Sequence, residues 1–302
     1  MNRAGAFMED AFSSCHPLIN FIFFIGAVLC GMFFTHPAFL AASAILSALY
    51  YLLLNGSRGA SFILKMAAFV LLIAVLNGVF NARGSTVLFT WISGRHFTLE
   101  ALLYGFAVGG MFFTVICWFA CYNKIMTSDK FTYLFGKISP AVSLVFCMVL
   151  RFVPSFQKKA GTISDARRCI GMSRKGGTKK EKLAEGMTVL SVMTSWALEN
   201  SQETAESMQS RGYGSGKRTQ FSIWRFRTRD RILLAIMAIC LIGLFVCAYS
   251  GGMKMKWIPS VRFPEKRELT ESGLVFYSVF LGIPPFIDMG EKVTWRFLRS
   301  KI

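Results

Sequence analysis

Residues 101–122 read ALLYGFAVGGMFFTVICWFACY, a stretch of 22 residues that holds no charged side chain. An α-helix rises about 1.5 Å per residue, and the hydrocarbon core of a bilayer is about 30 Å thick. Because about 20 apolar residues are enough to cross that core, this stretch predicts a membrane-spanning helix. It places the chain among helical membrane proteins.

Further apolar stretches lie on both sides of this one. Four are long enough to span, at residues 18–35, 37–54, 62–80 and 232–250, and a shorter one at 273–287 contains Pro284 and Pro285. The chain of 302 residues is 54% hydrophobic and 17% charged, whereas a soluble domain has roughly a quarter of its residues charged. The sequence therefore predicts an all-α polytopic membrane protein with five or six transmembrane helices.

The basic residues predict the orientation, since Lys and Arg concentrate on the cytoplasmic side of membrane proteins. The formal net charge is +18, and residues 123–231 carry 20 Lys or Arg against 8 Asp or Glu. Arg58 and Lys65 lie near the junction of the second and third spans without an acidic neighbour. We therefore expect the N-terminus and residues 123–231 in the cytoplasm. Residues 251–272 do not fit this orientation. The loop would lie outside the cell, yet it carries five Lys or Arg.

The central region is too polar to span the bilayer and too apolar for a plain solvated loop. Its two apolar runs end at Arg151 and Glu199, and a longer span would draw in charges that cost about 2.5–3.5 kcal/mol each at the membrane centre. We expect three cytoplasmic helices, near residues 139–152, 155–172 and 181–211. The predicted domains are a four-span bundle (1–122), a basic coupling-helix domain (123–231) and a C-terminal membrane segment (232–302).

Several functional classes find little support in the sequence. The three histidines are far apart, and none of the eight cysteines forms a CxxC pair, so we expect no metal site, no cofactor and ordinary packing roles for the thiols. Residues 212–218, GYGSGKR, lack the spacing of a phosphate-binding loop. Glu9 and Asp10 argue against a signal peptide. Membrane orientation explains the positive charge better than nucleic-acid binding does.

Two arginine segments stand out in the central region. They are SDARRCIG at residues 164–171 and ESMQSRGYG at residues 206–214, and each places arginine beside small residues at the end of a predicted helix. Small neighbours let a partner approach the backbone, while a guanidinium offers a rigid fork of donors. The alternative is an ordinary helix stop, with a solvated cation near the negative end of the helix dipole.

Several segments, taken in order, resemble the transmembrane T component of energy-coupling factor (ECF) transporters, a family that includes the membrane subunit of cobalt transporters. The resemblance covers roughly residues 16–231. The matching segments are His16-Pro17, FTLEA at 97–101, Thr127-Ser128, LRFVP at 150–154, and the two arginine segments. Residues 207–213, SMQSRGY, are similar to the family's Ala-Met-x-Ala-Arg-Gly-Tyr signature.

The resemblance implies that the two arginine motifs end long coupling helices that dock on two ATPase subunits. It gives Ser210, Arg211 and Gly212 as docking residues. In the first motif the family pattern falls on residues 166–171, which puts Cys169 and Ile170 in the Ala-Arg positions. Three further residues therefore stay open as the first docking contact, namely Ala166, Arg167 and Arg168.

The resemblance also implies a non-catalytic subunit of an ABC-type importer in the cell membrane of a bacterium or archaeon. ATP would be hydrolysed by the partner subunits, and a substrate-binding membrane S component would select the vitamin or metal ion. Two alternatives remain. A self-contained permease would need polar residues clustered within its spans, and an integral membrane enzyme would need a catalytic set beside the membrane.

Overall fold

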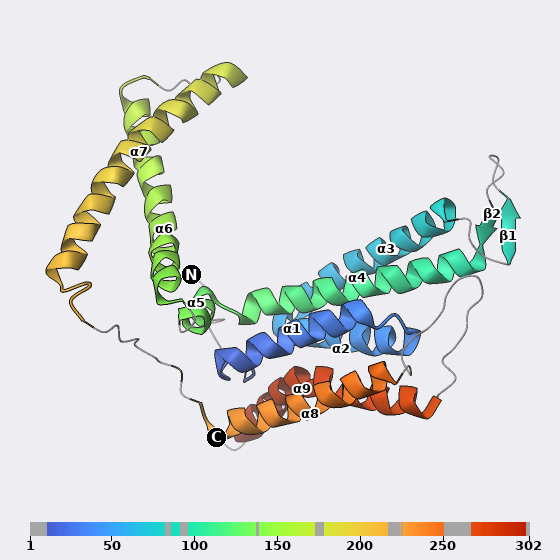
Figure 1. The fold of residues 1–302 in the computed structure, drawn as a ribbon. Coiled ribbons are helices and arrows are strands. Elements are labelled where there is room, and N and C mark those ends of the chain that lie inside the picture. Colours follow the sequence, from blue (N-terminus) through green and yellow to red (C-terminus); the bar gives the residue numbers. More distant parts are fainter. Residues whose placement is uncertain are drawn as a thin grey trace. The chain divides into compact units, whose positions relative to one another are not determined.

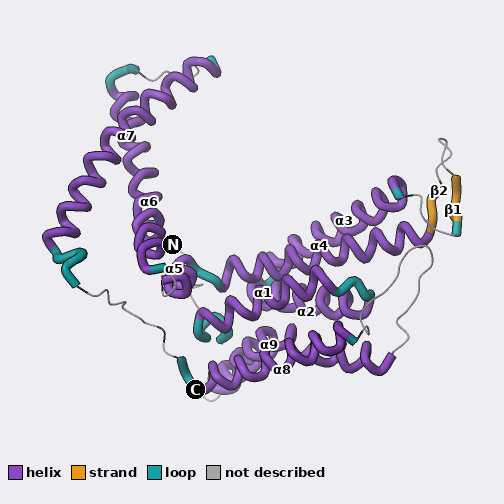
Figure 2. The backbone as a smooth tube through the Cα atoms, in the orientation of Figure 1, coloured by secondary structure: helices purple, strands orange, loops and turns teal. Residues whose placement is uncertain are grey.

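The computed structural model describes residues 11–81, 86–90, 96–136, 139–172, 178–216, 224, 226–250 and 267–299. Helices make up nearly all of this part, which confirms the all-α prediction (Figures 1 and 2). The helices are α1 (Pro17–Phe33), α2 (Pro37–Asn55), α3 (Ser57–Phe80), α4 (Leu99–Ile125), α5 (Ser128–Gly136), α6 (Pro140–Cys169), α7 (Lys179–Ser210), α8 (Thr228–Tyr249) and α9 (Arg267–Arg299). A two-stranded antiparallel hairpin, β1 (Val87–Thr90) with β2 (His96–Thr98), was not predicted.

The chain divides into two compact units. The first, which we call the bundle, comprises Met1–Lys130 and Trp224–Ile302. The second comprises Phe131–Ile223 and is named the helix pair after α6 and α7, its long helices. The second unit lies inside the predicted central domain of residues 123–231, and the two predicted membrane segments belong to one unit.

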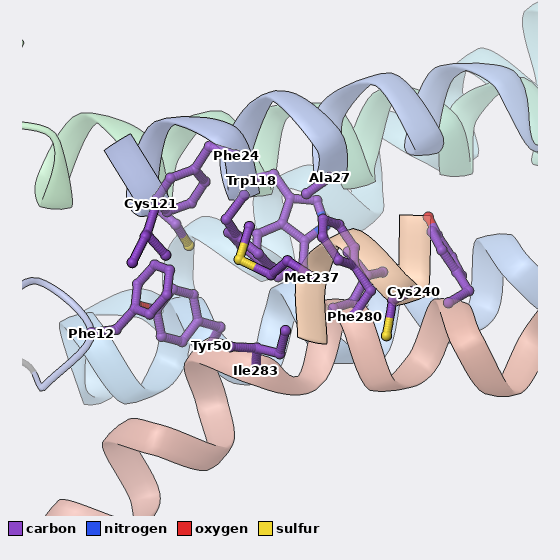
Figure 3. Packing of buried hydrophobic residues seen from close by; sticks show 14 of the residues in the cluster. Phe12, Phe24, Ala27, Tyr50, Trp118, Cys121, Met237, Cys240, Phe280 and Ile283 are labelled. Carbon is purple, nitrogen blue, oxygen red and sulfur yellow. The ribbon is translucent and has the colours of Figure 1, made fainter. Parts of the chain in front are cut away.

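Aromatic side chains fill the core of the bundle (Figure 3). Trp118 of α4 is fully buried and lies edge-on to Phe23, with 5.5 Å between the ring centroids. Its indole N–H donates to Ser43 Oγ of α2 at 3.3 Å, so the one polar group of the ring has a partner. Phe280 of α9 contacts Phe23 from another direction at 5.2 Å. The core thus joins helices from both ends of the sequence.

Small residues allow α3 and α4 to approach closely. A Cβ added at Gly105 would lie 2.8 Å from the Ala74 Cα, and one added at Gly109 would lie 2.9 Å from Val70 Cγ1. Contacts this short exclude any larger side chain without movement of the helices. Such close backbone packing is typical of membrane helices, where small residues increase van der Waals contact.

Polar side chains form hydrogen bonds with the backbone groups at the ends of several bundle helices. The Nδ1 atoms of His16 and His36 accept backbone N–H groups at the starts of α1 and α2, each at 3.3 Å and each followed by proline. At the other end of α2, Lys292 Nζ donates to the Leu53 carbonyl at 2.7 Å, and Lys124 Nζ donates to Asn55 Oδ1 at 3.1 Å. The positive charge of each lysine interacts favourably with the negative, C-terminal end of the helix dipole.

Six helices in the described part are long and apolar enough to cross a membrane, namely α2, α3, α4, α6, α8 and α9. Helix α1 is apolar but has 17 residues, fewer than the others. Five of the six lie at predicted spans, and α6 is the exception, because the sequence predicted cytoplasmic helices there. Its mean hydropathy of 1.3 is the lowest of the six. The cytoplasmic location of α6 stays a prediction.

The structure corrects the predicted helices of the central region. Helices expected at residues 139–152 and 155–172 form one continuous helix, α6, which runs through Pro154. Proline removes one backbone donor, but Phe152 and Phe156 stack across it with their ring centroids 6.0 Å apart. The third predicted helix corresponds to α7, and the short α5 was missed. The predicted break at Gly176 and Gly177 lies outside the described residues.

Helix α9 also runs through prolines, at Pro284 and Pro285, where the sequence suggested a kinked span or an interfacial segment. Half of its span-like window is buried inside the bundle, the largest share of the six candidates. It therefore belongs to the packed core. Most of the basic loop that disagrees with the predicted orientation, residues 251–266, lies outside the described residues.

Candidate docking ends of two long helices

Helices α6 and α7 meet near their midpoints. The rings of Phe156 and Trp196 lie edge-on with centroids 5.4 Å apart, and Lys159 Nζ lies 5.4 Å from the Trp196 ring centroid. Each helix continues about 13 residues beyond this contact toward its C-terminus, which corresponds to roughly 20 Å. The helices therefore cross, and their ends project away from the crossing.

Grooves on either side of the crossing show that the two helices are antiparallel. One groove, of about 360 Å³, lies between the end of α6 and the start of α7 and is lined by Arg167, Gly171, Met172, Glu181, Lys182, Ala184, Glu185 and Thr188. The other, of about 380 Å³, is lined by Leu144, Cys147, Met148, Arg151, Glu203, Thr204, Ser207, Met208 and Arg211. The C-terminal ends of α6 and α7 consequently point in opposite directions.

The end of α7 is a Schellman motif. Gly212 has φ +83°, a left-handed conformation that favours glycine. Its N–H donates to the Gln209 carbonyl, and the Tyr213 N–H donates to the Met208 carbonyl, both at 3.0 Å. Arg211 therefore occupies the C-cap position, where the chain turns away from the helix.

The end of α6 has the same geometry. Gly171 has φ +76°, its N–H donates to the Arg168 carbonyl, and the Met172 N–H donates to the Arg167 carbonyl, again at 3.0 Å each. Superposing the two motifs residue by residue sets Ile170 opposite Arg211 and Cys169 opposite Ser210. This is the same register as in the sequence comparison, with an apolar side chain at the first C-cap.

The two arginines of the first motif point to different surroundings. Arg167 lines the groove beside Glu181 and Glu185 of α7, and its Nε is buried without a hydrogen-bond partner among the described residues. Arg168 points outward and pairs with Asp165 at 3.4 Å, with both side chains more than half exposed. An ion pair this exposed contributes little to stability, so Arg168 is available to a partner.

The second motif presents its residues together. Ser210, Arg211 and Gly212 are all exposed at the end of α7, and Ser210 Oγ donates to the Ser207 carbonyl at 2.9 Å. Arg211 shares its groove with Arg151 and Glu203. The first groove thus combines Arg167 of α6 with two glutamates of α7, whereas in the second groove Arg151 of α6 lies with Glu203 of α7. The sequence did not predict Glu181, Glu185 and Glu203 as site residues.

These features define a class of protein. The bundle is a polytopic helical membrane unit, and the attached helix pair carries exposed arginines at two oppositely directed ends. In the described residues, both grooves at the helix ends are open to their surroundings. Within the part of the chain that the structure describes, the site is suited to contact with other proteins.

Comparison with known proteins agrees with this class and makes it specific. The family model CbiQ, described as cobalt transport protein, matches residues 13–223. The energy-coupling factor transporter transmembrane protein EcfT of Staphylococcus aureus is 24% identical over 193 residues, which cover 61% of this chain and 72% of that protein. The EcfT protein of Listeria innocua is 27% identical over 99 residues, 32% of this chain and 37% of its own length.

The family match covers more than half of the chain, so this protein belongs to the cobalt transport protein family, CbiQ. The resemblance to the ECF transporter T component is thereby confirmed. The match includes both arginine motifs and ends before α8.

Proposed function

We propose that this chain is the energy-coupling transmembrane subunit of an ECF-type ABC importer for a vitamin or a metal ion. The family match and the two EcfT relatives support this function over a self-contained permease or an integral membrane enzyme. The chain itself is non-catalytic. Its partners are two ATPase subunits, a substrate-binding membrane S component and the lipid bilayer, and it does not bind nucleic acid.

The bundle crosses the cell membrane with the N-terminus and the helix pair in the cytoplasm. If α1 is counted with the other bundle helices, the chain crosses six times and both termini lie on the cytoplasmic side. The strongly basic composition of residues 123–231 supports this orientation. Helix α6 then lies outside the bilayer, which agrees with its Arg151, Lys158 and Lys159 near the crossing.

One observation carries the proposal: α6 and α7 cross at their middles and end in the same motif on opposite sides. Two ends that point apart can engage two separate ATPase subunits at once. When ATP draws those subunits together, the helix ends move with them and the crossing acts as the pivot. The S component, in contact with the T component, is thereby tilted between outward and inward access.

The residues divide between the two ends. At the end of α7, Arg211 makes the charged contact, while Ser210 and Gly212 let the ATPase approach the backbone. At the end of α6, Arg168 is the exposed arginine and Ala166 is its small neighbour. Arg167 holds α7 at its start through the groove it shares with Glu181 and Glu185 rather than contacting the ATPase.

Co-purification with ATPase subunits of the same organism tests this function. A charge-assisted contact contributes about 1.5–3 kcal/mol, so Arg211→Ala should reduce ATPase recovery about 10-fold or more. Lys158→Ala is the control, because it removes an exposed cation from the middle of α6, away from both ends. Unchanged ATPase recovery with Arg211→Ala would contradict the docking role of this residue.

The alternative function, a self-contained permease, predicts a different result. It would bind substrate through polar groups within the bundle, and the asparagine pair of α3 is a candidate for that role. Asn81 Nδ2 donates to Asn77 Oδ1 at 2.8 Å, so one hydrogen bond joins these two amides at the end of the helix. Purification of the wild-type chain alone, under conditions that preserve other transporter complexes, would favour the permease.

A further inference from the structure

The chain passes between its two units at two places, after Lys130 and before Trp224. These two connections join the helix pair to the bundle along the chain. Residues 11–16, which precede α1, lie against both connections within the bundle, and we name them the N-terminal clamp.

The outgoing connection is bound to the clamp by Lys130. This side chain is only 4% exposed, and its Nζ donates to the Ser13 carbonyl at 2.6 Å, to Ser13 Oγ at 2.8 Å and to the Ile125 carbonyl at 2.9 Å. Three oxygen atoms match the three donors of an ammonium group. Because Ile125 is the last residue of α4, Lys130 also joins the end of that helix to the clamp.

The returning connection is bound to the same six residues. Arg229 Nη2 donates to Ser14 Oγ at 3.1 Å, and the His16 ring lies edge-on to Phe226 with 5.0 Å between centroids. Asp230 accepts the Arg227 N–H at 2.9 Å and the His16 N–H at a long 3.5 Å. Lys130 Nζ also lies 5.6 Å from the Trp224 ring centroid, so it contacts both connections.

The clamp itself is fixed in the bundle core. Phe12 is fully buried and lies edge-on to Phe23 and Phe24 of α1, at 5.4 and 6.3 Å. Its backbone N–H donates to Asp288 Oδ1 of α9 at 3.0 Å. Continuous contacts thus link both connections, through the clamp, to packed side chains of α1 and α9.

We propose that Lys130 is a positioning residue for energy coupling: it fixes the outgoing connection to the N-terminal clamp, so that motion of the helix pair moves the bundle. This inference rests on the proposed function. Lys130→Met keeps the length of the side chain and removes its donors, which separates the connection from Ser13 and Ile125. ATPase docking does not involve Lys130 and is retained.

Hydrogen–deuterium exchange on the complex with its ATPase and S-component partners tests the proposal without knowledge of the substrate. The nucleotide probe is the magnesium complex of a non-hydrolysable ATP analogue. In the wild type, the analogue should change deuterium uptake both in α6–α7 and in residues 11–16. In Lys130→Met the change in α6–α7 should persist, while most of the change at residues 11–16 should be lost. The contact of Arg229 with Ser14 on the returning connection accounts for what remains.

Two further variants control the experiment. Lys124→Met removes a lysine that binds Asn55 at the end of α2 instead of the clamp, so both changes should persist. Lys130→Arg keeps a cation and should retain both. The proposal is overturned if Lys130→Met keeps the change at residues 11–16, or if its uptake rises throughout the bundle without nucleotide, which marks a merely structural residue. A wild type without any nucleotide-dependent change in α6–α7 would instead contradict the proposed function.

Discussion

The bundle and the helix pair differ in what holds them together. In the bundle, Trp118 and Phe280 are fully buried among aromatic neighbours from several helices. In the helix pair, α7 has no buried residue, and Leu183 and Leu198 are 69% and 67% exposed. The bundle is thus stabilised by its own packing, whereas most of the surface of α7 is exposed. Under the proposed function, this difference separates a self-supporting membrane part from a part whose surface serves contact with partners.

The largest expected effect contrasts two tryptophan contacts, one in the bundle and one in the helix pair. Trp118→Ala removes the centre of the bundle core and should lower the free energy of unfolding by about 3–5 kcal/mol. Trp196→Ala removes a contact worth about 0.5–1.5 kcal/mol and should leave the bundle unaffected. Thermal unfolding of both variants in detergent measures the difference. An equal loss of Tm in the two variants would show that the units do not differ as described.

A smaller effect contrasts two glycines. Gly105→Ala places a Cβ 2.8 Å from Ala74 Cα between α3 and α4, and overpacking of this kind costs about 1–3 kcal/mol. Gly161 of α6 has nothing within 4 Å of an added Cβ, so Gly161→Ala should stabilise α6 by about 0.5–1 kcal/mol. Tm of the bundle measures the first change, and amide exchange of α6 measures the second. A neutral Gly105→Ala would argue against close α3–α4 packing.

Most of the bundle could be predicted from the sequence, because its apolar stretches have the length a bilayer demands. Two features departed from the local sequence signals, one in the helix pair and one in the bundle. Pro154 normally predicts a helix break, yet the stacking of Phe152 on Phe156 accompanies a continuous helix. The β1–β2 hairpin is too short to give a periodic pattern. Neither feature changes the number of helices in the bundle.

The candidate site was predictable only in part. The Arg-Gly pair at Arg211 and Gly212 is typical of a helix end, and the offset of Ile170 in the first motif is visible by counting residues. The grooves are different, because Glu181 and Glu185 join Arg167, and Glu203 joins Arg151, only when the two helices cross in the antiparallel sense. The crossing depends on Phe156 and Trp196, which are 40 residues apart in the sequence.

The central claim is that the ends of α6 and α7 bind two ATPase subunits. Photo-crosslinking tests it most directly, with a photoreactive amino acid placed in turn at Ile170 and at Tyr213, which are 66% and 45% exposed. The control position is Phe245 of α8, which is 74% exposed in the bundle. The account predicts an ATPase adduct from each helix end, on separate subunits, and none from Phe245. An intact complex that yields no ATPase adduct from either end would contradict it.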